Sequence, residues 1–152
     1  MEYILLLTAC INPDGMPFTC LADVGVRKKQ YIEALNFYLK NTTRKIVFVE
    51  NSGTDISSSF KDFQHRIEFL CFDGNLCFDK RKGKGYGEAL ILEYAMAKSE
   101  FITDDVLIFK LTGRLQLINL KSATLLKSQS VAAQTAKNAI FLVWTDFLPC
   151  VG

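Results

Sequence analysis

The feature that most constrains the fold of this chain is a series of four apolar runs, each followed by turn-forming residues. The runs cover residues 3–10, 45–50, 67–72 and 106–111, and the turn after the first is Asn12-Pro13-Asp14-Gly15. A run that is apolar without alternation is buried on both faces, which is typical of a central strand in a parallel sheet. Residues 139–144 predict a last strand, and residues 115–120 predict a short additional one.

Helical segments separate these runs. Apolar side chains recur with the helical period over residues 27–39, and residues 87–98 predict a second helix that is apolar nearly all round. A shorter helical piece is expected at 57–63, a loop with two prolines at 11–24, and a mixture of helix and loop at 121–138. Because strands and helices alternate, we expect a single α/β domain over residues 1–152, with a mainly parallel sheet in a three-layer α/β/α arrangement.

Charge and cysteine content narrow the class of protein. The net charge of +2 gives no reason to expect nucleic acid as a partner. The cysteines are odd in number and lack zinc spacing, so we expect reduced, buried thiols rather than a disulfide framework; they are Cys10, Cys20, Cys71, Cys77 and Cys150. No apolar run approaches the roughly 20 residues of a membrane span, and no signal peptide is evident. We therefore expect a soluble, cytoplasmic protein, with attachment to a membrane surface through a partner left open.

Polar clusters follow the predicted strands. In parallel α/β sheets the ligand binds beyond the carboxyl ends of the strands, and those ends meet at one edge. Four clusters occupy these positions, at residues 8–12, 50–53, 73–74 and 110–114. We therefore expect any functional site to lie where these clusters converge.

A basic, glycine-rich segment precedes the second long helix, at residues 80–88. Free amides and the helix dipole at such a position favour phosphate. The alternative is a solvated basic turn, with Glu88 serving only to complement the helix dipole. The glycine spacing matches neither a P-loop nor a dinucleotide-binding fingerprint.

Lys110 ends an apolar strand, where lysine normally lies only at an edge or at a site. A structural salt bridge and an anion-binding role both explain it. His65, the only histidine, favours a surface role over catalysis. The acidic pair Asp104-Asp105 favours two solvated acids in a loop over a divalent cation site.

Taken in chain order, five segments resemble bacterial GT-A type glycosyltransferases encoded in capsule, O-antigen and lipooligosaccharide gene clusters. The segments are residues 7–13, 27–38, 49–53, 82–88 and 110–114, within a resemblance that extends over about residues 3–120. The most specific part is Lys110-Leu111-Thr112-Gly113-Arg114 together with the glycine-rich stretch before it. The resemblance implies a nucleotide-sugar donor and transfer of its sugar to a glycan or lipid-linked acceptor, a precursor of a surface polysaccharide.

The resemblance also implies which residues contact the donor. Those expected to face the nucleoside are Thr8, Ala9, Asn12, Glu50, Asn51 and Ser52. Those expected near the rest of the donor are Lys84, Gly85 and Glu88, with Lys110, Thr112 and Arg114 near the diphosphate or the sugar. A departing nucleoside diphosphate develops negative charge, which fixed cations stabilise.

The chain departs from this family in two respects. Many members hold a metal with an Asp-x-Asp motif where this chain has residues 110–114, so we expect either cations in place of the metal or an Mg²⁺ or Mn²⁺ ion at another position. Members usually continue beyond the donor-binding half, and residues 121–152 do not resemble that continuation, so we expect a shortened chain. One alternative is a non-catalytic nucleotide-binding remnant. A nucleotidyltransferase ranks last, because that class carries a glycine-rich loop after the first strand and this chain does not.

Overall fold

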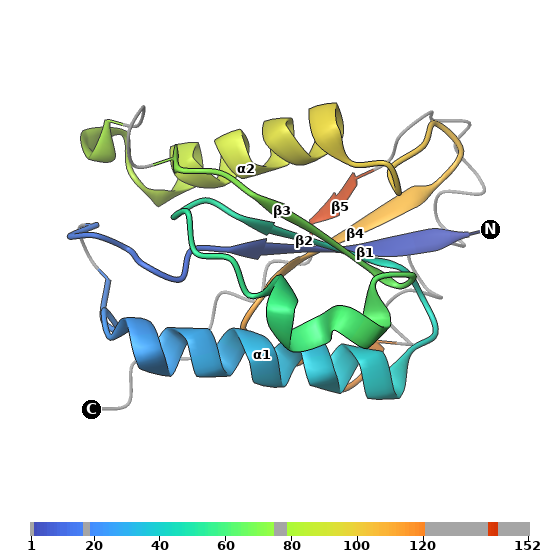
Figure 1. The fold of residues 1–152 in the computed structure, drawn as a ribbon. Helices are drawn as coiled ribbons and strands as arrows, with labels where there is room; N and C mark the ends of the chain where they lie inside the picture. The colour runs from blue at the N-terminus through green and yellow to red at the C-terminus, as the bar shows by residue number, and fades with distance from the viewer. Residues whose placement is uncertain (1, 17–18, 75–78, 121–139, 143–152) are drawn as a thin grey trace.

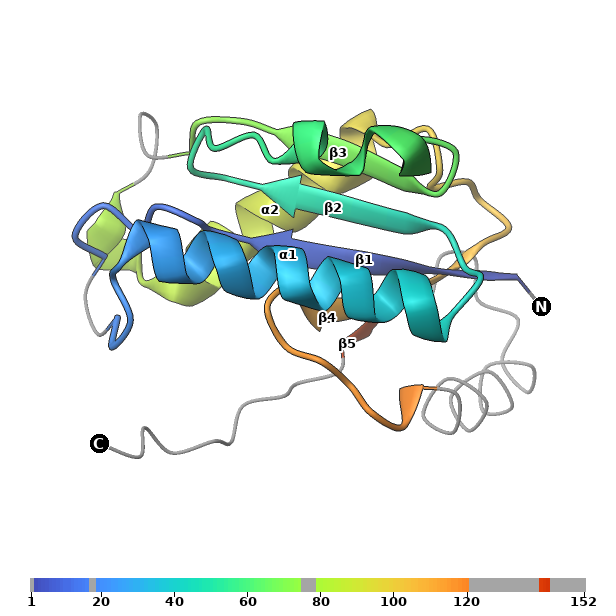
Figure 2. The same cartoon turned by 60° about the horizontal axis from the view of Figure 1, so that its bottom comes forward.

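The computed structural model describes residues 2–16, 19–74, 79–120 and 140–142. Its strands form one sheet in which every neighbouring pair is parallel; they are β1 (Tyr3–Ala9), β2 (Ile46–Glu50), β3 (Ile67–Cys71), β4 (Leu107–Thr112) and β5 (Ile140–Leu142). The strand order is β3-β2-β1-β4-β5, which can be followed in Figure 2. The first four strands begin and end within one residue of their predicted bounds. The predicted 139–144 strand is seen only as β5, because its other residues lie outside the described ranges.

Two long helices cover the sheet, one on each face (Figure 1). They are α1 (Val24–Asn41) and α2 (Lys84–Lys98), and shorter 3-10 helices lie at η1 (Ser57–Phe63) and η3 (Lys80–Lys82). Both long helices begin at the edge where the strands end, at the left in Figure 1. This arrangement confirms the predicted α/β architecture with a parallel sheet between helices. The predicted segment 121–138 lies outside the described residues.

Both long helices begin three residues before their predicted starts. The Asp23 carboxylate accepts a hydrogen bond from the Val26 amide at 2.7 Å and so caps α1 at Val24. Gly83, with φ of 82°, directly precedes α2, so the chain enters that helix from a backbone conformation that favours glycine. Gly85 therefore lies within the first turn of α2 rather than in a loop.

Alternation along the strands divides the core between the two faces of the sheet. On the α1 side, strand residues such as Leu5, Leu7 and Phe48 pack with Leu35 and Tyr38 of the helix. The α2 side has its own cluster, formed by Ile4, Leu6, Val47, Val49, Ile91, Ala95, Val106 and Ile108. The residues of β1 are nearly all buried, which is why its sequence shows no polar alternation.

The predicted strand at residues 115–120 is wrong, because these residues form turns and irregular backbone. The Tyr38 hydroxyl donates to the Leu115 carbonyl at 2.7 Å and accepts from the Leu117 amide at 3.1 Å. A side chain of α1 therefore satisfies backbone groups that would otherwise need a neighbouring strand.

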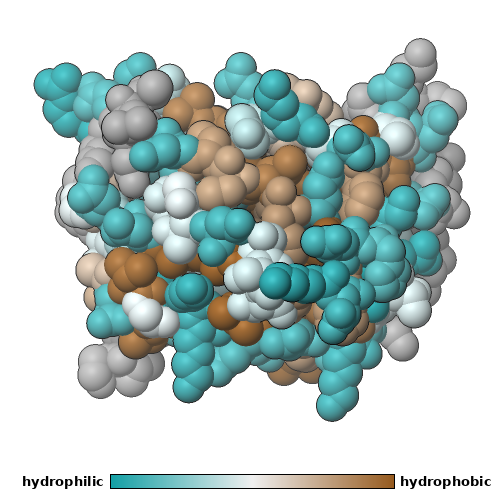
Figure 3. All heavy atoms as spheres, viewed as in Figure 1, coloured by the Kyte–Doolittle hydropathy of each residue, from teal (hydrophilic) through white to brown (hydrophobic). Residues whose placement is uncertain are grey.

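The described cysteines are less buried than predicted: Cys10 and Cys71 are half-buried and Cys20 is exposed. Cys77 and Cys150 lie outside the described residues. No helix among the described residues has both the length and the apolar character needed to cross a membrane. In Figure 3 hydrophilic side chains project along the two helix layers, and more hydrophobic surface shows between them.

Candidate functional site

The candidate site lies where the strand order reverses. From β1 the chain passes first to β2 and β3 on one side, and later to β4 and β5 on the other. The point between β1 and β4 is therefore the topological switch point, at whose carboxyl edge open α/β sheets bind their ligands. Thr8 and Thr112 lie opposite each other in this pair of strands, two residues beyond the Leu6–Lys110 pair.

Three predicted site residues meet on the α2 side of this point. The Lys110 ammonium forms an ion pair with Oε1 of Glu88, and the Thr8 hydroxyl donates to the same oxygen at 3.1 Å. The Lys110 side chain is 7% exposed and that of Glu88 is 32% exposed. The cluster therefore joins the ends of β1 and β4 to the beginning of α2.

This cluster settles one of the open questions about Lys110. The structural salt bridge is present, and a buried ammonium needs such a partner because desolvation of an unpaired charge is costly. Glu88 is engaged with Lys110 rather than only with the helix dipole. A divalent cation does not fit here, because Glu88 is the single carboxylate of the cluster and one of its oxygens is bound to an ammonium. Among the described residues, no group of three or more His, Cys, Asp or Glu could hold a metal.

Glu50 forms a second centre, on the α1 side of β2. Its side chain is 1% exposed, and it accepts hydrogen bonds from the backbone amides of Ile11, Ser52 and Thr54, each at 2.9 Å, and from the Ser52 hydroxyl. Burial, with the Glu50 carboxylate beside it, raises the pKa of the Cys71 thiol to about 11. Glu50 therefore holds the loops after β1 and β2 together.

The neighbouring predicted residues share this region. The Asn12 amide donates to the Ser52 hydroxyl at 2.9 Å, whereas Ala9 is buried in the core on the α1 side. The Asn51 backbone accepts the Gly74 amide at 2.8 Å, while its side-chain Oδ1 is buried and has no hydrogen-bond partner among the described residues. Asn51 is thus the one of these residues with an unused polar atom beside the strand ends.

The basic turn is largely solvated, as one of the two interpretations expected. Lys84 and Gly85 are exposed in the first turn of α2. Arg81 pairs with the Asp79 carboxylate at 2.9 Å, and Lys82 lies over the Tyr86 ring at 4.5 Å from its centre. The cations before α2 are therefore spread over the surface rather than gathered around one point.

The segment after β4 lies tightly against β1. A Cβ atom on Gly113 would lie 2.8 Å from the Thr8 carbonyl oxygen and 3.2 Å from Cε1 of Tyr31, so only glycine fits there. Its amide donates to the same Thr8 oxygen at 2.8 Å. This contact fixes the half-buried Arg114, whose guanidinium donates to the Gln30 side-chain oxygen at 3.4 Å.

Arg27 was not among the predicted site residues. It is 6% exposed and donates to the carbonyl oxygens of Cys10, at 2.9 Å from Nε, and Leu21, at 3.0 Å from Nη1. One signal could have indicated it: an arginine near the amino end of a helix opposes the helix dipole, so another interaction must hold it there.

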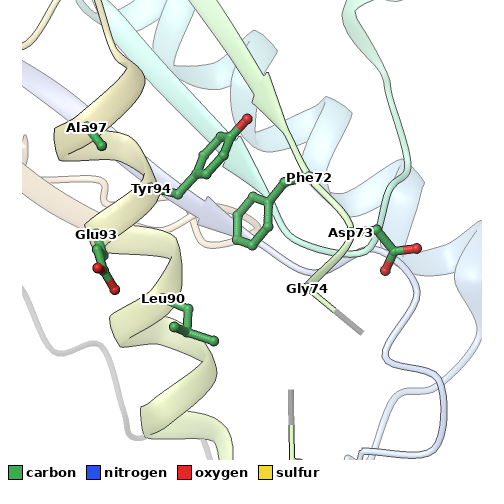
Figure 4. A pocket seen from close by; sticks show the side chains of 7 residues that line it. All are labelled: Phe72, Asp73, Gly74, Leu90, Glu93, Tyr94 and Ala97. Atoms are coloured by element: carbon green, nitrogen blue, oxygen red, sulfur yellow. The ribbon is translucent and has the colours of Figure 1, made fainter. Parts of the chain in front are cut away.

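An apolar pocket of about 340 Å³ lies beside the strand ends, between the end of β3 and α2. Figure 4 shows the stacked rings of Phe72 and Tyr94 in its wall, with Leu90 from the helix; their ring centres are 4.3 Å apart. Gly74, which also lines the pocket, is the residue bonded to the Asn51 backbone.

The predicted site residues thus form separate groups at one edge of the sheet. Thr8, Glu88 and Lys110 meet directly, and Asn12, Glu50 and Ser52 form a second connected group. The other six predicted residues are not part of the contacts just described; they are Ala9, Asn51, Lys84, Gly85, Thr112 and Arg114. His65, Asp104 and Asp105 are exposed, in agreement with the surface roles expected of them.

Comparisons of the chain with protein-family models, with curated proteins and with solved structures found no match.

Proposed function

We propose that this chain binds a nucleotide-sugar donor at the β1–β4 switch point and is the donor-binding part of a GT-A type glycosyltransferase of bacterial surface-polysaccharide synthesis. The observation that carries the proposal is the placement of Thr8, Lys110 and Thr112, with Glu88, where parallel α/β sheets bind nucleotides. The family resemblance of the sequence supplies the class of ligand.

The surroundings of the switch point support a nucleotide. The apolar pocket lined by Phe72 and Tyr94 offers a surface for a planar base, and the buried Oδ1 of nearby Asn51 has no hydrogen-bond donor among the described residues. Pockets of this kind combine apolar walls with a few polar atoms that fix orientation. Arg114 contributes a cation at the same edge for a diphosphate.

The reaction in this proposal transfers the sugar to a hydroxyl of a glycan or lipid-linked acceptor. The bond between the anomeric carbon and the diphosphate oxygen breaks, the acceptor oxygen bonds to that carbon, and the acceptor hydroxyl loses its proton to water. The nucleoside diphosphate leaves with the bonding electrons and one additional negative charge, which nearby cations stabilise.

Thermal unfolding tests the binding step. UDP, GDP, CDP and their sugar conjugates are added separately to the purified chain. The nucleotides that carry one of the three bases are expected to raise the Tm. At 100 times its Kd a ligand stabilises the folded state by about 2.7 kcal/mol, which corresponds to roughly 5–10 °C for a chain of this size. Absence of a shift with every nucleotide would contradict the proposal.

A pair of threonine variants tests the location. Thr112→Val removes a half-buried hydroxyl at the end of β4 and is expected to weaken nucleotide binding about 2- to 10-fold, the value of one neutral hydrogen bond. Thr43→Val removes an exposed hydroxyl just after α1, and it should leave binding unchanged.

Release of free sugar or transfer to an added acceptor, measured with the same chain, distinguishes an enzyme from a binding remnant.

A further inference from the structure

Two arginines at the carboxyl edge of the sheet have no carboxylate partner among the residues that the structure describes. Arg27 of α1 is 6% exposed, and its hydrogen bonds go to the carbonyl oxygens of Cys10 and Leu21. Arg114, directly after the turn that follows β4, is half-buried and bonds to the neutral side chain of Gln30. The ion pairs found in the described part of the chain involve other residues.

Both arginines lie near the side chain of Tyr31. The Tyr31 hydroxyl is 3.4 Å from the Cys10 carbonyl oxygen that also accepts from Arg27. Gly113 lies against the same ring, so close that a Cβ there would lie 3.2 Å from Cε1, and Arg114 is the next residue. Burial raises the pKa of Tyr31, and the positive charges of Arg27 and Arg114 oppose that rise.

This arrangement leaves positive charge and hydrogen-bond donors unused. A guanidinium has five N–H donors, and the bonds of Arg27 occupy three of them. Two arginines near one ring repel each other, and a desolvated charge without a counter-ion is costly. A bound oxoanion removes both the repulsion and the cost of the missing counter-ion, because a guanidinium donates two parallel N–H hydrogen bonds to phosphate oxygens.

On the opposite face of the same edge, the buried cation has a carboxylate partner. Side chains alternate along β4, so Lys110 points to the α2 side, where Glu88 neutralises it. Leu111 packs into the α1-side core, and Gly113 lies against Tyr31 on that side. Among the described residues of this edge, the buried and half-buried cations without a carboxylate partner therefore lie on the α1 side of the switch point, whereas the cations of the basic turn before α2 are exposed.

We propose that Arg114, with the buried charge of Arg27 behind it, forms a phosphate-binding site on the α1 side of the switch point. The inference rests on the proposed function in one respect: the phosphate is the diphosphate of the nucleotide-sugar donor. Arg114 is the residue that contacts the phosphate oxygens. Arg27 is a positioning residue that holds the Cys10 and Leu21 carbonyls and adds positive potential, which acts strongly because the group is buried.

Binding measurements on four chains test this site with two probes, inorganic pyrophosphate and the nucleoside diphosphate that raises the Tm most. Arg114→Gln removes the charge but keeps a polar side chain, and it should weaken binding of both probes roughly 10- to 100-fold. Arg114→Lys keeps the charge but loses the paired donors, so an intermediate loss is expected. Lys28→Gln is the matched control, because it removes an exposed cation next to Arg27.

The outcomes separate this site from the proposed function. A loss of pyrophosphate binding in Arg114→Gln, with Lys28→Gln near the wild-type Kd, supports the arginine site even where no nucleoside diphosphate binds. An equal loss in Lys28→Gln would show general charge attraction and overturn the site. Binding of the nucleotide but not of pyrophosphate, with Arg114→Gln unchanged, would overturn the site and leave the proposed function standing. No binding of either probe would overturn both.

Discussion

Replacement of Glu50 by glutamine tests whether this buried carboxylate organises the strand ends. One carboxylate oxygen accepts the Ile11 amide and the Ser52 hydroxyl, and the other accepts the amides of Ser52 and Thr54. A glutamine side chain has nearly the same shape, but its NH₂ group must take one of the two positions. In either orientation an N–H group then points at a backbone N–H donor.

The geometry indicates which orientation costs less. With NH₂ toward Ile11, the Ser52 hydroxyl can rotate and accept from it, so a single buried backbone amide loses its acceptor. Leaving a buried donor unsatisfied costs about 1–3 kcal/mol. For a domain of this size that loss lowers the Tm by roughly 2–12 °C. Glu50→Leu removes the acceptor from all three amides and should cost more.

Urea unfolding followed by far-ultraviolet circular dichroism measures the effect. The matched control is Glu33→Gln on the surface of α1, where the carboxylate lies 3.9 Å from the ammonium of Lys29 and both side chains are more than half exposed. Exposed pairs of this kind contribute less than about 1 kcal/mol. Glu50→Gln with the stability of the control would refute the organising role. A stabilised variant would instead indicate a carboxylate held in place for a ligand at the expense of stability.

Two further predictions concern packing and thiol reactivity. Gly113→Ala places a methyl group 2.8 Å from the Thr8 carbonyl oxygen and should lower the free energy of unfolding by about 1–3 kcal/mol. Gly85→Ala, in the open first turn of α2, should instead raise the free energy of unfolding by up to about 1 kcal/mol. Equal effects of the two substitutions in urea unfolding would contradict this contrast. Burial raises the pKa of Cys71 to about 11, so only about one Cys71 thiol in a thousand is ionised at pH 8. Iodoacetamide should therefore label exposed Cys20 before Cys71. Peptide mass spectrometry showing equal labelling rates would count against the burial of Cys71.

The sequence allowed the strands to be predicted well because burial on both faces leaves a signal in each run by itself. Residues 3–10 are apolar without alternation, and the strand formed there is buried almost throughout. Helix starts were less predictable. The true beginnings depend on single residues outside the apolar pattern, namely the cap at Asp23 and the positive φ of Gly83.

Contacts between distant segments could not be predicted from local pattern. Nothing near residues 115–117 shows that the Tyr38 hydroxyl, on α1, takes the place of a neighbouring strand. The partner of Lys110 was equally hidden, because Glu88 belongs to a helix whose start was predicted three residues late. In both cases the local structure depends on a side chain that is far away in the sequence.

The division of charge between the two faces gives the proposed donor one orientation at this edge. On the α1 side, Arg27 and Arg114 have no carboxylate partner in the described part of the chain, whereas the α2 side holds the ion pair of Lys110 with Glu88 and, beyond it, the apolar pocket beside Asn51. Neighbouring strands lie about 4.8 Å apart, so β4, which Arg114 follows, and β3, which ends beside the pocket, are three spacings or roughly 14 Å apart, a span comparable with an extended nucleoside diphosphate. The proposal therefore places the diphosphate at the arginines and the base at the pocket. A larger side chain at Leu90 should then weaken nucleotide binding and leave pyrophosphate binding unchanged; equal weakening of both would reject this orientation.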